Sequence, residues 1–66
     1  MEVLVNGEPR QLAESATVAQ LLDELASVGK RLAVEVNQEI VPRSLHASHK
    51  LRAGDRIEIV HAIGGG

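Results

Sequence analysis

The sequence ends in three consecutive glycines, Gly64, Gly65 and Gly66, which directly follow an apolar run that closes at Ile63. Glycine adds no side chain to a core and loses more backbone entropy on ordering than any other residue, so these three residues contribute nothing to folding. They predict a thin, flexible arm that reaches about 10 Å past the folded body, at roughly 3.3 to 3.6 Å per residue. Such an arm can deliver its terminal carboxyl group into the active site of another protein. The competing interpretation is a frayed end or a cloning remnant.

The carboxyl group of Gly66 is the reactive group that this arm would present. A terminal carboxyl is ionised at neutral pH, and a carboxylate is a poor electrophile, so another protein must activate it. Transfer to the α-phosphate of a nucleotide would give an acyl-adenylate, whose carbonyl carbon a sulfur or nitrogen nucleophile can attack. Because the chain contains no cysteine, it cannot hold sulfur on its own thiol. If sulfur is the cargo, Gly66 is the place for it.

Other arrangements of reactive side chains are weak. His46 and His49 are three residues apart, and His61 is a third imidazole, but no cysteine or carboxylate at matching spacing completes a zinc site. No Ser, His and Asp pattern resembles a nucleophile elbow, and the glycines cannot form a phosphate loop because no helix follows them. We therefore expect no metal site, no bound cofactor and no catalysis within this chain.

Composition limits the classes of protein to consider. The 66 residues form one small domain, which buries only about 60% of the surface of its unfolded chain. Seven basic and nine acidic residues, with no aromatic residue, provide neither the charge nor the stacking surfaces of a nucleic-acid binder. No apolar run approaches the ~20 residues of a membrane span, and the first residues lack the basic start of a signal peptide. We expect a cytoplasmic protein that binds neither nucleic acid nor membrane.

The first half of the chain predicts a hairpin followed by a helix. Val3–Val5 and Pro9–Leu12 flank Asn6-Gly7, one of the strongest dipeptides for a hairpin turn. Thr17 and Gln20 have the spacing of a capping box, and the apolar residues that follow recur at helical spacing. The pattern predicts a helix over 18–28 that ends at Gly29.

The second half predicts strands separated by turns. Residues 32–36 alternate between apolar and other side chains, residues 37–39 form a turn, and residues 40–41 form a short strand that Pro42 ends. Residues 43–52 have no regular pattern, with room for one helical turn around 44–47 that Ser44 could cap. After a turn at 53–55, Ile57 and Ile59 mark the last strand, which runs into the glycines.

A sheet with one helix must lay that helix across one face, which leaves the other face open to water or to a partner. If Ile57 and Ile59 point toward the helix, then Val60 points away from it, and Leu4 does likewise between Val3 and Val5. Leu4 and Val60 are therefore candidates for a partner interface, although single surface aliphatic residues are common.

Taken together, the hairpin, the crossing helix, the further short strands and the terminal Gly-Gly resemble the ubiquitin-like β-grasp fold, and within it the ThiS family of thiamine-biosynthesis sulfur carriers. The similarity covers nearly the whole chain. The matching stretches are Val3 to Asn6, Thr17-Val18 with Leu21-Leu22 and Leu25, Val34 to Arg43, Gly54-Asp55, and Gly65-Gly66.

The resemblance implies an α+β fold: a ubiquitin-like β-grasp, with a mixed sheet of four to five strands and one helix packed across one face. The domain would span residues 1–63 and the flexible glycine tail residues 64–66. It also implies that a ubiquitin-activating-like adenylyltransferase, using ATP and magnesium, adenylylates Gly66. The group is then converted to a thiocarboxylate, with sulfur from a donor such as a cysteine desulfurase persulfide. Thiazole synthase would accept that sulfur, so this chain would be a cosubstrate and no enzyme.

Three alternatives remain open at this point. A sulfur carrier of molybdopterin synthesis would use the same tail with a different acceptor, although such carriers are usually longer and contain aromatic residues. A ubiquitin-like modifier would join Gly66 to a lysine of a target protein. A plain interaction domain with an inert tail would keep its function without Gly65 and Gly66.

Overall fold

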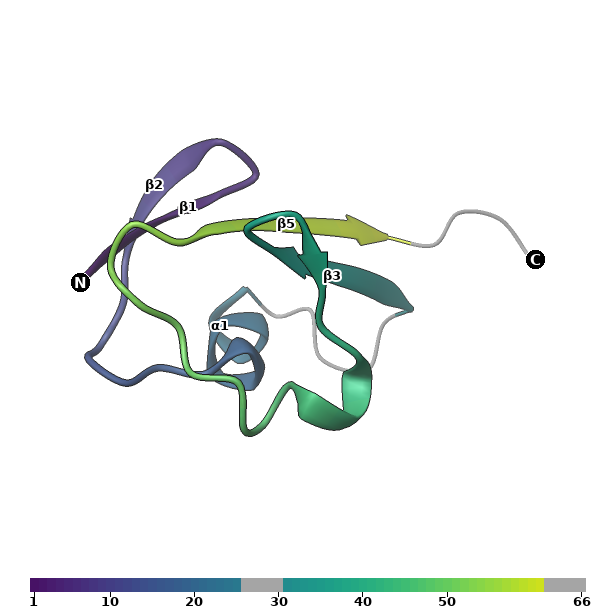
Figure 1. Ribbon diagram of the computed structural model, residues 1–66. Helices are drawn as coiled ribbons and strands as arrows, with labels where there is room; N and C mark the ends of the chain where they lie inside the picture. The colour runs from purple at the N-terminus through teal and green to yellow at the C-terminus, as the bar shows by residue number, and fades with distance from the viewer. Residues whose placement is uncertain (26–30, 62–66) are drawn as a thin grey trace.

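The computed structural model describes residues 1–25 and 31–61, which form a five-stranded mixed sheet with one helix across one face (Figure 1). In chain order the elements are β1 (Glu2–Val5), β2 (Glu8–Gln11), α1 (Val18–Glu24), β3 (Leu32–Val36), β4 (Glu39–Ile40), the 3₁₀ helix η1 (Arg43–Leu45) and β5 (Arg56–His61). The strand order is β2-β1-β5-β3-β4, so β5 is the central strand. The predicted α+β architecture is confirmed, while the predicted domain boundary at residue 63 lies outside the described residues.

The predicted N-terminal hairpin is confirmed. Asn6 and Gly7 form its two-residue turn with φ values of 51° and 84°, which asparagine and glycine tolerate better than other residues. The second strand begins at Glu8, one residue earlier than predicted, because Glu8 pairs directly with Val5 across the turn. Pro9 is accommodated because β2 is an edge strand.

The predicted capping box starts α1. The Oγ1 atom of Thr17 accepts a hydrogen bond from the Gln20 N–H (3.2 Å), and the Oε1 atom of Gln20 accepts one from the Thr17 N–H (2.8 Å). The helix ends at Glu24, with Leu25 at its C-cap. The predicted continuation over 26–28 and the predicted end at Gly29 lie outside the described residues.

The turn between β3 and β4 is shorter than predicted. Asn37 and Gln38 form it with φ values of 52° and 70°, and Glu39 already pairs with Val36 in β4. The short strand is therefore 39–40 and not 40–41. Val41 follows it, donates its N–H to the Val34 carbonyl (2.9 Å) and is buried in the core.

The predicted helical turn in this segment is present, but it begins earlier than the predicted 44–47, and the proposed cap by Ser44 is wrong. The turn is η1, one residue earlier, with Pro42 at its N-cap and no side-chain cap. Pro42 has φ −59°, which proline favours in any context, so the ring sets where the turn begins. The loop after η1 then lies beside the start of α1, where the Leu51 N–H donates to the Ala16 carbonyl (2.8 Å). This contact brings Leu51 into the core.

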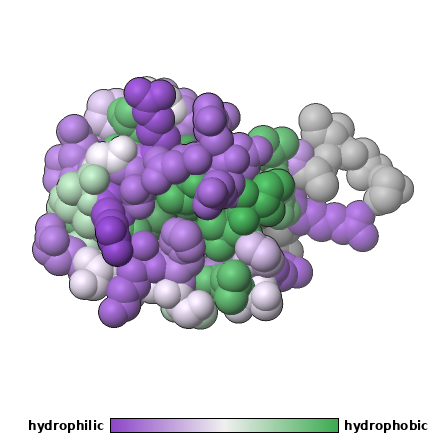
Figure 2. All heavy atoms as spheres, viewed as in Figure 1, coloured by the Kyte–Doolittle hydropathy of each residue, from purple (hydrophilic) through white to green (hydrophobic). Residues whose placement is uncertain are grey.

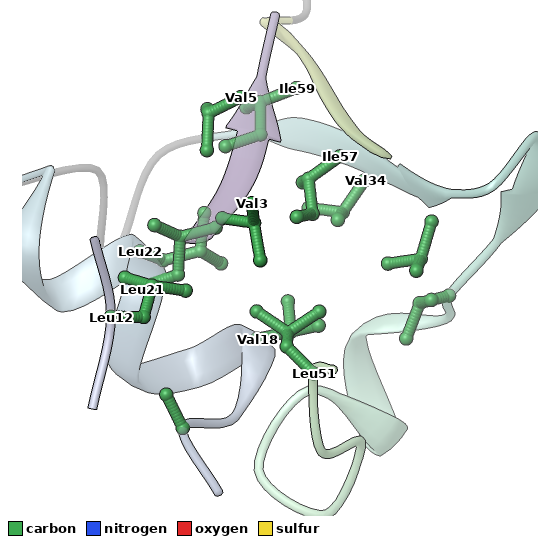
Figure 3. Close-up of a cluster of buried hydrophobic side chains, with 13 residues drawn as sticks. Val3, Val5, Leu12, Val18, Leu21, Leu22, Val34, Leu51, Ile57 and Ile59 are labelled. Atoms are coloured by element: carbon green, nitrogen blue, oxygen red, sulfur yellow. The ribbon is translucent and has the colours of Figure 1, made fainter. Parts of the chain in front are cut away.

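The core lies between the sheet and α1 (Figure 3). The sheet contributes valines and isoleucines, and the helix and loops contribute mostly leucines together with Ala16, Val18 and Val41, so the core is built from aliphatic side chains alone. The buried apolar residues are Val3, Val5, Leu12, Ala16, Val18, Leu21, Leu22, Val34, Val36, Val41, Leu51, Ile57 and Ile59. In the space-filling view, polar residues cover much of the surface, and apolar residues show between them (Figure 2).

Candidate functional site

The central strand β5 leads directly into the C-terminal residues. It lies between β1, to which it is parallel, and β3, to which it is antiparallel (Figure 1). The predicted site residues Gly64, Gly65 and Gly66 lie outside the described residues. The described part of the site consists of β5, which precedes these glycines, and of the residues that contact β5.

The two neighbours of β5 pair with it to different extents. The β3 register covers five residue pairs, from Val36 opposite Ile57 to Leu32 opposite His61. The β1 register covers only two pairs, which end with Val5 opposite Ile57, because the hairpin turn follows. On the β1 side, the last part of β5 is held by the side chain of Asn6. The sequence analysis assigned Asn6 only to the turn and missed this contact, which no local pattern indicates.

Leu4 and Val60 lie on the open face of the sheet, as predicted. Val60 is 59% exposed and stands opposite Ala33, whereas its neighbour Ile59 is 7% exposed on the helix side. Leu4 is half-buried and stands beside Arg56 in the register between β1 and β5. The structure therefore puts both residues on the predicted face, and their role in binding a partner stays a prediction.

Ile40 is a third aliphatic residue on the open face, and the sequence analysis did not select it. It is 64% exposed and stands opposite Glu35 in the register between β3 and β4. Glu35 in turn stands opposite Glu58. Carboxylates thus lie between Ile40 and the other open-face residues, Leu4 and Val60, and the three do not form one continuous apolar patch. Alternation with the buried Val41 was the signal that could have identified Ile40.

A hollow of about 440 Å³ lies beside the end of β5, between the hairpin and the end of α1. Its lining includes Asn6, Arg10, Leu25 and His61. The Nη2 atom of Arg10 lies 3.5 Å from the Oε1 atom of Glu24, both side chains being more than a third exposed, so the pair contributes little to stability. The hollow offers hydrogen-bonding groups beside the end of β5, and among residues 1–25 and 31–61 its lining includes no Ser, Thr or Cys nucleophile.

The histidines do not come together. His46 places its Nε2 atom 3.0 Å from the Val41 carbonyl oxygen, His49 lines a separate hollow near Met1, and His61 lies at the end of β5. Over residues 1–25 and 31–61, no three His, Asp or Glu side chains are grouped so that they could hold a metal ion. In the same part of the chain, no helix has the length and apolar character needed to cross a membrane.

Comparison with known proteins identifies one family. The sequence model of the ThiS family matches residues 3–66. The chain is 38% identical over 66 residues to the sulfur carrier protein ThiS of Escherichia coli, covering all of both chains. Its fold is similar to the crystal structure of a thiamine biosynthesis protein (ThiS) from Geobacter metallireducens, with a TM-score of 0.85, 33% identity and full coverage of both chains.

Longer proteins also contain a similar stretch. The chain is 47% identical over 66 residues to a thiazole synthase of Paramagnetospirillum magneticum, and 38% identical to one of Magnetococcus marinus. In both cases the match covers all of this chain but only 20% of the relative. The similar segment is therefore a small part of each of these thiazole synthases.

Proposed function

The chain belongs to the ThiS family, and on this basis we propose that it is a sulfur carrier protein of thiamine biosynthesis. The observation that carries the proposal is the match to the sulfur carrier of Escherichia coli, which extends over the full length of both chains. The similarity in fold to a second ThiS protein, at a TM-score of 0.85, supports it independently of single motifs. We propose that the protein acts as a cosubstrate, because the reactive group that it contributes is consumed and regenerated in each cycle.

Gly66 is the proposed carrier residue. A carboxylate oxygen of Gly66 attacks the α-phosphate of ATP, pyrophosphate leaves, and a mixed anhydride with AMP forms. A persulfide sulfur, from a donor such as a cysteine desulfurase, then displaces AMP from the carbonyl carbon. Cleavage of the S–S bond by a second thiol leaves a thiocarboxylate on Gly66. The absence of cysteine from the chain supports this assignment, because no thiol of its own can hold the sulfur.

The catalytic groups for this chemistry are proposed to belong to the partner. A ubiquitin-activating-like adenylyltransferase would bind ATP and magnesium and would receive the slim arm formed by Gly64, Gly65 and Gly66. Because ATP is the co-reactant, we propose a cytoplasmic location. In this scheme the domain presents the arm and a docking surface, for which Leu4 and Val60 on the open face are the candidates.

The proposed acceptor of the sulfur is thiazole synthase. Two thiazole synthases contain a segment that resembles this entire chain, at 47% and 38% identity. A carrier-like segment within the chain of the acceptor supports a functional link between the two proteins. An acceptor from molybdopterin synthesis is the alternative, and no observation on this chain favours it.

The decisive experiment is intact-protein mass spectrometry. The protein is incubated with ATP, magnesium, the adenylyltransferase of the same organism and a persulfide donor, and any change in mass is located by fragmentation. Localisation is needed because oxidation of Met1 adds nearly the same mass as exchanging oxygen for sulfur. We expect the exchange on Gly66. A lysine adduct would indicate a modifier instead, and an unchanged tail with a demonstrably active enzyme would refute the carrier function.

A further inference from the structure

Besides forming the hairpin turn, Asn6 makes hydrogen bonds to β5 through both its main chain and its side chain. Its N–H donates to the Ile57 carbonyl (2.8 Å). Its side-chain Oδ1 atom accepts a hydrogen bond from the Ile59 N–H (2.8 Å), and its Nδ2 atom donates to the Ile59 carbonyl (3.4 Å). A single residue thus makes three hydrogen bonds to the central strand.

These bonds extend a pairing that the backbone of β1 cannot continue. Strand β1 stops at Val5, opposite Ile57, and Asn6 has a left-handed backbone (φ 51°) that turns the chain toward β2. The side-chain carboxamide of Asn6 has a C=O acceptor and an NH₂ donor, so it offers the same kinds of hydrogen bond as a backbone peptide group. It takes the place that the next peptide group of β1 would occupy. Ile59 is therefore paired through its N–H and carbonyl although no strand residue stands opposite it on that side. Val5 and Ile59, both labelled in Figure 3, line the same hollow as Asn6.

Asn37 makes a related set of bonds at the start of β5. It follows β3 as Asn6 follows β1, and its φ value is 52°. Its Oδ1 atom accepts a hydrogen bond from the Arg56 N–H (3.0 Å), and its own N–H donates to the Arg56 carbonyl (2.8 Å). Its Nδ2 atom donates to Asp55 (3.0 Å). Residue type, left-handed backbone and bonded strand are the same. The two residues bond opposite ends of β5, and the Nδ2 atom of Asn37 donates to the Asp55 carboxylate where that of Asn6 donates to the Ile59 carbonyl.

We propose that Asn6 is a positioning residue for activation of the C-terminus, whereas Asn37 only stabilises the fold. Asn6 holds Ile59 from the β1 side, two residues before β5 ends at His61, while β3 pairs with β5 as far as His61, so loss of the Asn6 side chain would free one edge of the strand that precedes the C-terminal residues. This proposal rests on the proposed carrier function. Orientation of the reacting groups supplies a large part of the rate, so looser anchoring of the strand at the base of the arm is expected to lower the fraction of encounters in which the carboxyl group reaches an in-line position on ATP.

The test compares Asn6→Gly with Asn37→Gly. Glycine tolerates the positive φ at both positions, so each change removes the side chain without straining the backbone. Amide hydrogen exchange measured by NMR reports the contact itself: we expect exchange at Ile59 to accelerate about tenfold or more in Asn6→Gly, and exchange at Arg56 in Asn37→Gly.

Steady-state pyrophosphate release with the adenylyltransferase, ATP and magnesium then reports positioning. At a temperature where circular dichroism shows both variants folded, we expect kcat to fall about tenfold for Asn6→Gly while KM changes less than about twofold. The KM is expected to change little because the candidate docking residues Leu4 and Val60 are unchanged, although Asn6 lines a hollow beside Leu4. Asn37→Gly is expected to keep both constants within about twofold of the wild type.

A conservative variant distinguishes loss of the hydrogen bonds from a general folding defect. Asn6→Asp keeps the acceptor for the Ile59 N–H but loses the donor to the Ile59 carbonyl, so we expect a kcat between those of the wild type and Asn6→Gly. Equal losses of kcat in Asn6→Gly and Asn37→Gly would overturn the proposal, as would an unchanged kcat in Asn6→Gly. If the wild-type chain itself released no pyrophosphate, the carrier function would fail first, which is a different result from either of these.

Discussion

Alanine substitutions at the neighbouring residues Ile59 and Val60 should have different effects: Ile59→Ala should lower the stability of the domain, and Val60→Ala should weaken its binding to the adenylyltransferase. Ile59 is 7% exposed on the helix side of the sheet, and Val60 is 59% exposed on the open face. Replacing a buried isoleucine with alanine costs about 2 to 5 kcal/mol. Ile59 also lines the hollow beside the hairpin, where water and neighbouring side chains can relax, so we expect Ile59→Ala to cost about 2 to 3 kcal/mol.

Such a loss is large for this chain. A domain of 66 residues is stable by about 3 to 10 kcal/mol at 0.05 to 0.15 kcal/mol per residue. A loss of 2 to 3 kcal/mol corresponds to a fall in Tm of roughly 10 to 20 °C for a domain of this size. Val60→Ala should change the free energy of unfolding by no more than about 0.5 kcal/mol, because its side chain already contacts water.

Urea and thermal unfolding followed by far-ultraviolet circular dichroism measure both variants, since the chain has no tryptophan or tyrosine for fluorescence. Binding to the adenylyltransferase, measured by calorimetry at a temperature where both variants are folded, is expected to weaken for Val60→Ala and to stay unchanged for Ile59→Ala. Equal destabilisation by the two changes, or a loss below about 1 kcal/mol for Ile59→Ala, would refute the assignment of the two faces.

Further predictions concern the cap, a turn and the tail. Thr17→Ala removes the acceptor of the Gln20 N–H and should cost about 0.5 to 2 kcal/mol in urea unfolding; an unchanged midpoint would contradict the capping box. Gly54 has φ +85° with open space around it, so Gly54→Ala should destabilise by roughly 1 kcal/mol through backbone strain alone, and a stabilised variant would show that the turn adapts. Deleting Gly65 and Gly66 should leave the unfolding midpoint unchanged and abolish adenylylation. Gly65→Val should also block adenylylation, and normal turnover of this variant would refute a narrow entry channel.

Local signals predicted the elements whose causes are local. The Asn6-Gly7 turn, the Thr17 cap and the alternation in β3 each depend on residues within a few positions of one another, and each is confirmed. Errors occurred where a neighbour in the fold decided the boundary. Glu39 belongs to β4 because Val36 stands opposite it, and η1 starts one residue early because Pro42 sets its first turn.

The contacts of β5 could not be predicted from local patterns. Asn6 and Ile59 are 53 residues apart in the sequence, and Asn37 and Arg56 are 19 apart. Tolerance of a positive φ already explains an asparagine in a turn, so the sequence pattern does not indicate that its side chain also bonds to β5. Only the order of the strands, which puts β5 between β1 and β3, brings the two side chains to its edges.

The position of β5 explains how so small a domain can hold the strand that precedes the proposed carrier residue Gly66. A chain whose last strand lay at the edge of the sheet would be held from one side only, and its end would fray. Here the last strand is central: β3 pairs with it as far as His61, and Asn6 extends the pairing from the other side to Ile59. Its inward residues, Ile57 and Ile59, are part of the same core that holds α1. The strand that leads to the C-terminal glycines is therefore held at both edges and by the core, and the arm proposed for residues 64–66 follows a strand that the sheet already orders.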